Sequence, residues 1–390
     1  MILKLPTAWL QLKFEKIRLL VAIAGISFAV VLMFMQLGFR TALFDSAVRL
    51  HSSLQGEIFL ISPRSTALIA MMSFSKRRLY QVLALPEVEY VTPIYLGFAQ
   101  WKNPQNPSYW RNIHAIGFDI KYPVFDFPGV RQNQEHLQIP DLVLFDEASR
   151  PEFGQIAAEF QRQGAITTEI DNRATGSRKI TVIGLFKLGT SFGVDGNIIT
   201  SHLNFLRIFS QRSQGEIDLG LIKVKPGTNI NKLKKSLREY LPNDVNVLSK
   251  QELLDFEKRY WMTSTAIGFI FDLGVGMGLV VGIVFVYQIL YTNVSDHLAE
   301  FATLKAIGYK HRYLLSVVFQ EAIILAILGY IPGFLIASVL YKLAKTATLL
   351  PIAMENNRSL FILMLTFFMC FISGAIAMRK LKAVDPSDVF

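Results

Sequence analysis

The sequence of 390 residues has little cysteine and little charge. It holds one Cys, so no disulfide bond can form within the chain. Charged residues make up 18% of the chain and hydrophobic residues 52%, whereas ordinary soluble domains are about 25% charged. This composition is too apolar for one soluble domain or for a disordered protein. The net charge of +10 suggests either a nucleic acid or an anionic membrane surface as a partner.

The sequence also lacks the motifs of common catalytic and metal sites. It contains no G-x-x-x-x-G-K-[ST], so the chain does not itself hold ATP on a P-loop, and it contains no H-E-x-x-H or C-x-x-C. The six His are scattered along the chain. Ser191 lies in a G-x-S-x-G string, but the residues after it predict a turn, whereas a nucleophile elbow requires a helix. We therefore expect no catalytic residue, no metal and no cofactor in this chain.

Four stretches are long enough to cross a bilayer, which takes about 20 apolar residues. They are residues 19–39, 264–291, 313–341 and 359–378. Asp272 and Glu321 are the only charged residues within them. A carboxylate inside a membrane is costly, so both are candidate functional residues, although snorkelling or capping of a neighbouring helix would also explain them.

Basic residues predict how these spans are oriented. Lys and Arg are frequent in residues 1–18, in loop 292–312 and in the tail 379–390, so both termini and this loop are expected in the cytoplasm. Residues 1–18 predict an amphipathic helix on the inner membrane surface, or a continuation of the first span. Residues 40–263 and loop 342–358 then lie outside. The distribution of basic charge removes the need for a nucleic acid partner.

The outer segment, residues 40–263, predicts a large α+β domain. A strand over 57–62, a helix over 75–85 and a strand over 88–101 form one β-α-β set. A second set follows at 220–224, 229–241 and 245–248. We expect these sets to be the two halves of one α/β subdomain. Short strands between about 141 and 209 predict an inserted β-rich subdomain. A helix over 251–260 leads to Trp261, which is expected at the membrane interface.

Two features of the membrane part predict close contacts. Gly274, Gly278 and Gly282 repeat the G-x-x-x-G spacing, which lets helices approach closely, either within one chain or between two. In loop 292–312, a short helix is expected from its cap at Ser295 to its end at Gly308. An apolar stripe follows one face of this helix, with Lys305 in its last turn. The stripe consists of Leu298, Phe301, Leu304 and Ile307. Such a helix suits docking into a groove of a soluble partner, or else lies flat at the interface.

Several strings carry a family resemblance. Residues 297–308 (HLAEFATLKAIG), the tail 379–386 and the order of the spans resemble the FtsX-like and MacB-like permeases of type VII ABC systems. Further strings resemble the DevC-type permeases of cyanobacteria, in a likeness that runs along the whole chain. These strings are residues 32–39, 94–103, 256–258, 291–300 and 349–354.

The resemblance implies an α-helical inner-membrane protein with a porter-like periplasmic domain and no active site. Two copies would form a homodimer, and a separate DevA-like ATPase carrying ATP and Mg would dock on the 295–308 helix. A DevB-like membrane-fusion adaptor and a TolC-like outer-membrane channel would complete an exporter, whose cargo is a glycolipid where DevC has a named role. The residues matching the family's coupling motif are Glu300, Thr303, Leu304, Lys305 and Gly308.

Two other functions fit the same sequence features. One is a lipoprotein-releasing subunit of the LolC/LolE type, which hands its cargo to a chaperone. The other is an FtsX-like protein that signals across the membrane to a wall hydrolase. The outer segment of residues 40–263 is much larger than that of the cell-division FtsX proteins, which disfavours the second alternative.

Overall fold

The computed structural model describes residues 16–172, 176–297, 299–300, 303, 307, 309 and 311–382. The predicted amphipathic helix therefore lies almost wholly outside the described residues, as does the end of the tail. The chain forms two compact units. One is helical, and the other contains residues 43–265 together with 349–351.

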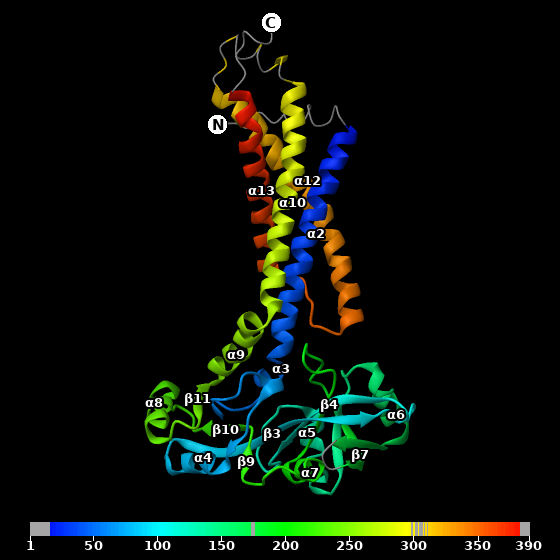
Figure 1. Ribbon diagram of the computed structural model, residues 1–390, viewed down its shortest axis with the longest axis vertical. Helices are drawn as coiled ribbons and strands as arrows, with labels where there is room; N and C mark the ends of the chain where they lie inside the picture. Colours follow the sequence, from blue (N-terminus) through cyan, green and yellow to red (C-terminus); the bar gives the residue numbers. More distant parts are fainter. Residues whose placement is uncertain are drawn as a thin grey trace. The chain divides into compact units, whose positions relative to one another are not determined.

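The helical unit contains four long helices, which Figure 1 shows together. They are α2 (Lys16–Ala47), α10 (Ala266–Asp296), α12 (His311–Thr348) and α13 (Asn356–Lys382). Each has the length and hydropathy needed to cross a membrane, which confirms the four predicted spans. The helices continue past the apolar runs, because polar residues at a span's ends can still make helical backbone hydrogen bonds. The connection between α12 and α13 is accordingly shorter than the predicted loop 342–358.

In the described part of the outer unit, nine strands form one sheet, in the order β11-β1-β10-β3-β4-β8-β5-β7-β6. A separate short ladder pairs β2 (Phe74–Ser75) with β9 (Glu216–Ile217). The strands of the sheet are β1 (Ile58–Ile61), β3 (Val88–Lys102), β4 (Trp110–Phe118), β5 (Leu142–Asp146), β6 (Ile166–Asn172), β7 (Gly176–Phe186), β8 (Asn197–Ser201), β10 (Leu219–Val224) and β11 (Asn246–Ser249).

The first half of the sheet consists of the two predicted β-α-β sets. Strands β11, β1, β10 and β3 pair antiparallel, and β1 lies between β10 and β11 of the second set. Helix α4 (Lys76–Gln81) with the turn η2 (Val82–Ala84) connects the first set, and α8 (Ile230–Tyr240) connects the second. This interleaving is a split β-α-β arrangement, as expected for one α/β subdomain.

The second half of the sheet curls back onto β3. Strand β3 pairs with β10 from Val88 to Ile94 and with β4 from Ile94 to Lys102. Strand β6 pairs with β3 at Gln100 and Trp101, which closes β3, β4, β8, β5, β7 and β6 into a ring. The β-rich region around 141–209 is thus built on the same long strand as the first half. The sequence analysis did not predict strands β4 and β6.

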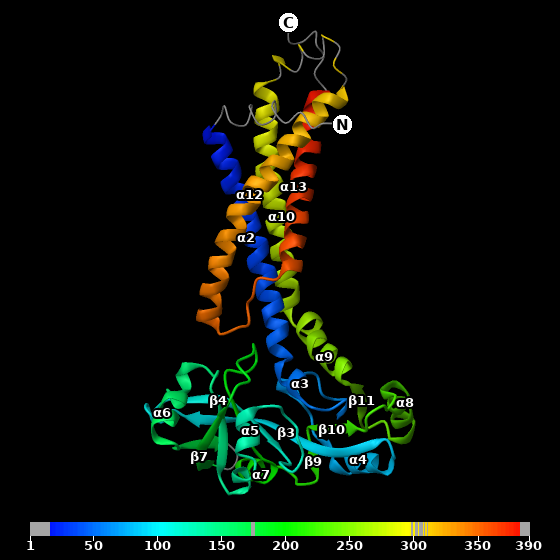
Figure 2. The same cartoon turned by 180° about the vertical axis from the view of Figure 1, so that it is seen from behind.

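Both faces of the sheet are covered, because successive side chains of a strand point to opposite faces. Ile58 and Leu60 of β1 belong to one apolar core, and Phe59 and Ile61 belong to the other. The first core also receives side chains from α4, α8 and α7 (His202–Ile208). The second receives them from α3 (Arg49–Ser53), α5 (Pro128–Gln132) and α9 (Lys250–Arg259). Figure 2 shows α3 and α9 on the side of the sheet opposite α7.

Short elements complete the outer unit. They are η1 (Leu68–Ala70), η3 (His136–Gln138), η4 (Pro151–Phe153), α6 (Ile156–Gln163) and η5 (Tyr260–Ser264), the last a single π-helical turn.

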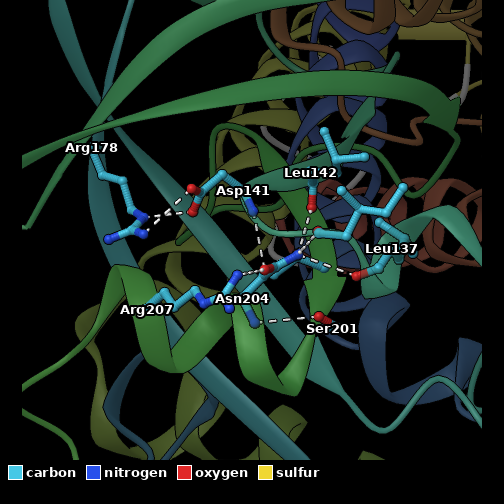
Figure 3. Close-up of polar contacts among 9 residues, drawn as sticks. Leu137, Asp141, Leu142, Arg178, Ser201, Asn204 and Arg207 are labelled. Carbon is cyan, nitrogen blue, oxygen red and sulfur yellow. Dashed lines mark hydrogen bonds and ion pairs between the residues drawn. The ribbon is translucent and has the colours of Figure 1, made fainter.

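One asparagine fixes the turn before β5. The Asn204 side chain on α7 accepts a hydrogen bond from the Asp141 backbone N–H at 3.1 Å and donates to the Ile139 carbonyl at 2.8 Å (Figure 3). Asp141 adopts φ of 64°, a left-handed conformation that Asp tolerates better than most residues. Its carboxylate pairs with Arg178 at 2.5 Å. These contacts have a structural role, because they set where β5 begins.

Candidate functional site

The three glycines of the predicted G-x-x-x-G repeat lie against helices of the same chain. A Cβ atom built on Gly278 would stand 3.2 Å from Met33 Cγ of α2, and one on Gly274 would stand 2.4 Å from Gln36 Cδ. A Cβ on Gly282 would meet Ala29 of α2 and Met369 of α13. Any larger side chain would push these helices apart, so the repeat brings α2 close to α10.

Helix α12 packs on α2 by the same means. A Cβ on Gly329 would stand 2.4 Å from Ile26 Cγ2, and one on Gly333 would stand 2.8 Å from Val30 Cβ. Ser27 of α2 also donates to the Gly329 carbonyl at 2.9 Å. Gly276 on α10 differs, because a Cβ there would meet nothing within 4 Å. Gly329 and Gly333 are therefore needed for close helix packing, whereas Gly276 is not.

The two candidate carboxylates of the spans have separate partners. Asp272 of α10 forms an ion pair with Arg40 of α2 at 3.0 Å. Glu321 of α12 is buried and accepts a hydrogen bond from the Asn293 amide of α10 at 3.0 Å. A partner offsets part of the cost of placing a carboxylate in a membrane. The structure thus assigns each residue an interhelical contact.

Polar contacts lie at both ends of the bundle. Asn293 is three residues before Asp296, the last residue of α10, and Asp296 forms an ion pair with Arg18 of α2. At the other end, the Tyr341 hydroxyl of α12 donates to the Phe34 carbonyl at 2.5 Å. Arg358, which the sequence placed in a loop, is buried in α13 and donates to the Ala353 carbonyl at 2.8 Å. The Arg18–Asp296 contact joins α2 to α10, and the Tyr341–Phe34 contact joins α2 to α12.

The structure describes three of the predicted ATPase-coupling residues, namely Glu300, Thr303 and Ile307, and all three are exposed. The Thr303 hydroxyl donates to the Ala299 carbonyl at 2.9 Å, and the Ile307 N–H donates to the Thr303 carbonyl at 3.0 Å. This i to i+4 spacing is helical. The other predicted members lie outside the described residues. They are Leu298, Phe301, Leu304, Lys305 and Gly308.

The predicted cap of this short helix, Ser295, belongs to the preceding membrane helix. Ser295 lies inside α10, and its hydroxyl donates to the Tyr291 carbonyl at 2.8 Å. The apolar run of the second span ended at Tyr291, but the helical backbone continues for a further turn. The coupling segment therefore follows directly from a membrane helix.

Sequence reasoning missed a buried carboxylate where the outer unit leads into α10. Glu257 Oε2 accepts the Leu68 backbone N–H at 2.8 Å, and Oε1 accepts the Trp261 indole N–H at 2.9 Å. His51 Nε2 of α3 lies 3.9 Å from Oε2. Burial raises the pKa of Glu257 to about 7 and lowers the pKa of His51 to about 4. The available signal was the i, i+4 spacing of Leu253, Glu257 and Trp261, which places a carboxylate on an apolar helix face.

Trp261 itself is buried inside the outer unit. The indole N–H, the one polar group of this side chain, donates a hydrogen bond to Glu257. The expectation that Trp261 lies at the level of the membrane interface stays a prediction.

The expected absence of a metal site can be compared with the described residues. Among them, no three His, Cys, Asp or Glu side chains are grouped closely enough to hold a metal ion. Ser191 lies in a tight turn, in which its N–H donates to the Val194 carbonyl at 2.8 Å. This confirms the predicted turn where a nucleophile elbow would need a helix.

Fold and site together define a multi-pass membrane subunit with a large domain between its first two spans. Comparison with protein families gives two matches: the MacB-like periplasmic core domain over residues 19–240, and the FtsX-like permease C-terminal domain over residues 273–386. The first match covers more than half of the chain, so the chain belongs to the MacB/FtsX-like family of ABC permeases. It is a transmembrane ABC transporter subunit.

Two solved structures are similar to the outer unit. One is the periplasmic region of MacB from Actinobacillus actinomycetemcomitans, with 12% identity, a TM-score of 0.36, and coverage of 55% of this chain and 96% of that chain. The other is the extracellular domain of the noncanonical ABC-type transporter YknZ from Gram-positive bacteria, with 11% identity, a TM-score of 0.35, and coverage of 50% and 100%. The comparison with curated proteins gives no match.

Proposed function

We propose that this chain is the permease of a tripartite export system, in which it passes motion across the membrane and leaves the cargo path outside its spans. The observation that supports this best is the packing of α2 against α10 and α12 through Gly278, Gly329 and Gly333. A path for a polar solute through the bundle would need space and polar groups at these contacts. A closely packed bundle suits the transmission of movement.

Two chains would pair as a homodimer in the inner membrane, with both termini in the cytoplasm and the outer unit in the periplasm. A DevA-like ATPase would bind ATP and Mg and dock on the segment that follows α10. The side chains proposed to contact it are Leu298, Glu300, Phe301, Thr303, Leu304, Lys305, Ile307 and Gly308. Exposure of Ile307, an apolar residue next to a membrane helix, supports a docking role.

The outer unit would bind a DevB-like membrane-fusion adaptor, which continues into a TolC-like outer-membrane channel. The chain passes between the bundle and the outer unit near the end of α2, before the start of α10, and on either side of residues 349–351. ATP-driven closure of the cytoplasmic partners would move the outer units and push cargo from the periplasm into the channel. The cargo proposed is an amphipathic molecule such as a glycolipid.

The decisive experiment is crosslinking in intact cells, followed by purification of the full chain and identification of its partners. Recovery of a long periplasmic adaptor together with a separate ATPase would support the tripartite exporter. Recovery of the ATPase with a periplasmic lipoprotein chaperone would support a LolC/LolE-like subunit instead. Recovery with a wall hydrolase would support FtsX-like signalling. Lipid profiling of a deletion strain would then identify the cargo class.

A further inference from the structure

Three segments of the outer unit bring exposed apolar side chains together. Ile69 and Met72 lie in and just after η1, Phe192 lies in the 189–194 turn, and Met262 lies in the π-helical turn η5. Phe192 is 54% exposed. We call these four side chains the Phe192 patch.

The three segments contact one another around Trp261. The Phe192 ring packs edge-on against the Trp261 ring, with centroids 5.4 Å apart. A Cβ on Gly193 would lie 2.7 Å from Ile69 Cγ2 and 3.5 Å from Trp261 Cζ2. The turn that carries Phe192 thus contacts both Ile69 and Trp261, segments that are distant in the sequence, and Met72 and Met262 lie three residues and one residue further along these two segments.

Buried carboxylates hold the patch in place from beneath. Glu257 binds both Trp261 and the N–H of Leu68, the residue before Ile69. Asp146 is buried and fixes the start of the 189–194 turn, because it accepts the Gly189 N–H at 2.8 Å and the Asn197 amide at 2.9 Å. The turn that carries Phe192 is thus held by hydrogen bonds, and Phe192 is exposed although its turn is fixed.

The position of Met262 in the chain indicates what covers the patch. Met262 is four residues before Ala266, where α10 begins, and Phe269 and Ile270 of α10 are already exposed apolar residues. Four residues span at most about 14 Å, a reach that ends within or close to the headgroup layer of a bilayer. Lys258 and Arg259 in the last turn of α9 add positive charge suited to lipid phosphates.

We propose that the Phe192 patch inserts into the interface of the outer leaflet and binds bilayer lipid. The partner is the lipid bilayer, recognised by apolar side chains at acyl-chain depth and by neighbouring basic residues at headgroup depth. This contact rests on the membrane span alone and does not depend on the proposed export function. It gives the outer unit a lipid contact in addition to its chain connections.

The test uses the full chain in nanodiscs of phosphatidylcholine and phosphatidylglycerol. Cys370→Ala removes the one native thiol, which is buried in α13. Nitroxide labels are then placed singly with Phe192→Cys and Met72→Cys. Matched controls are Leu203→Cys on α7 and Tyr240→Cys on α8, since Leu203 is 55% and Tyr240 54% exposed. Power saturation measures how accessible each label is to oxygen, which enters lipid, and to a water-soluble nickel complex, which does not.

We expect the ratio of oxygen to nickel accessibility to be several-fold higher at residues 192 and 72 than at the two controls. Introducing Phe192→Asp should lower the ratio at residue 72, and thermal unfolding of the same variant shows that the chain stays folded. Equal ratios at all four positions would overturn the proposal. Labels at 192 and 72 that are shielded from both reagents would indicate a protein partner and would overturn it as well.

Discussion

The Trp261 indole N–H donates to Glu257 Oε1 at 2.9 Å, one helical turn away, where the outer unit leads into α10. The other carboxylate oxygen of Glu257 holds the backbone N–H of Leu68 at 2.8 Å. One side chain thus joins α9, η5 and η1 within the outer unit. This contact has measurable consequences for stability and for its dependence on pH.

Glu257→Ala should destabilise the outer unit, because it leaves two buried N–H groups without partners. Each such group costs about 1–3 kcal/mol, so a lower thermal midpoint is expected in the full chain. Glu257→Gln retains one acceptor oxygen and should have an intermediate midpoint. Asp255→Ala, an exposed change on the same helix, serves as the control. Equal midpoints for Glu257→Ala and Asp255→Ala would contradict the assigned role.

The stability of the wild-type chain should fall between pH 6 and pH 8 more steeply than that of Glu257→Gln. The pKa of Glu257 is raised to about 7 in the folded chain, so its contribution is fully present below its ordinary pKa. That contribution is lost as the pH rises through about 7, which amounts to about 1 kcal/mol over this window. Chemical denaturation at several pH values measures the difference. Parallel curves for the two proteins would rule out the proposed titration.

His114 gives the opposite dependence. Its side chain on β4 is buried, and Asn197 faces it with Oδ1 3.4 Å from Nδ1. Burial lowers its pKa to about 4, so its contribution to stability is present above its ordinary pKa and is lost as the pH falls through about 4. His114→Gln should therefore flatten the loss of stability between pH 6.5 and pH 4. Thermal midpoints across this range test it, and an unchanged slope would count against it.

Much of this fold could be predicted from the sequence, because its signals are local. Apolar runs identify the four spans, and β-branched residues identify strands such as β3 and β10. Strand β4 was missed because Arg111, Asn112 and His114 interrupt its apolar pattern. The ring closure was missed because the pairing of Trp101 with Ile170 joins distant segments.

The candidate site was less predictable, because it depends on which elements are neighbours. The spacing of Gly274, Gly278 and Gly282 indicates close packing but does not say against which helix. The partners of Asp272 and Glu321 come from other helices for the same reason. Glu257 looks like any surface carboxylate until Leu68 and Trp261 are seen to surround it.

Gly329→Ala should destabilise the helical unit, whereas Gly276→Ala should not. A Cβ at position 329 would lie 2.4 Å from the β-branched Ile26 side chain, which has little freedom to move, and one at 276 would meet nothing. Alanine at an open helical position is favoured over glycine by about 1 kcal/mol. Thermal unfolding of both variants in detergent is the measurement. A lower midpoint for Gly276→Ala would contradict the contact pattern.

Leu304→Asp and Ile307→Asp should abolish docking of the ATPase partner while leaving membrane insertion intact. A buried carboxylate in an apolar groove carries a large desolvation cost. Co-purification of the ATPase with the full chain measures docking, and Ile139→Asp on the outer unit provides an exposed control. Normal recovery of the ATPase with both loop variants would reject the coupling segment.

Strand β3 carries a consequence for how the outer unit can move. Its first residues pair with β10 and its last residues pair with β4 and β6, and Ile94 has a register partner in both the β10 and the β4 ladder. Folding the two halves of the domain toward each other would require breaking ladder hydrogen bonds on both sides of this strand. We therefore expect the two halves of the domain to move together. A movement of α3 or α9 should therefore be passed through β3 to the ring of strands β3, β4, β8, β5, β7 and β6.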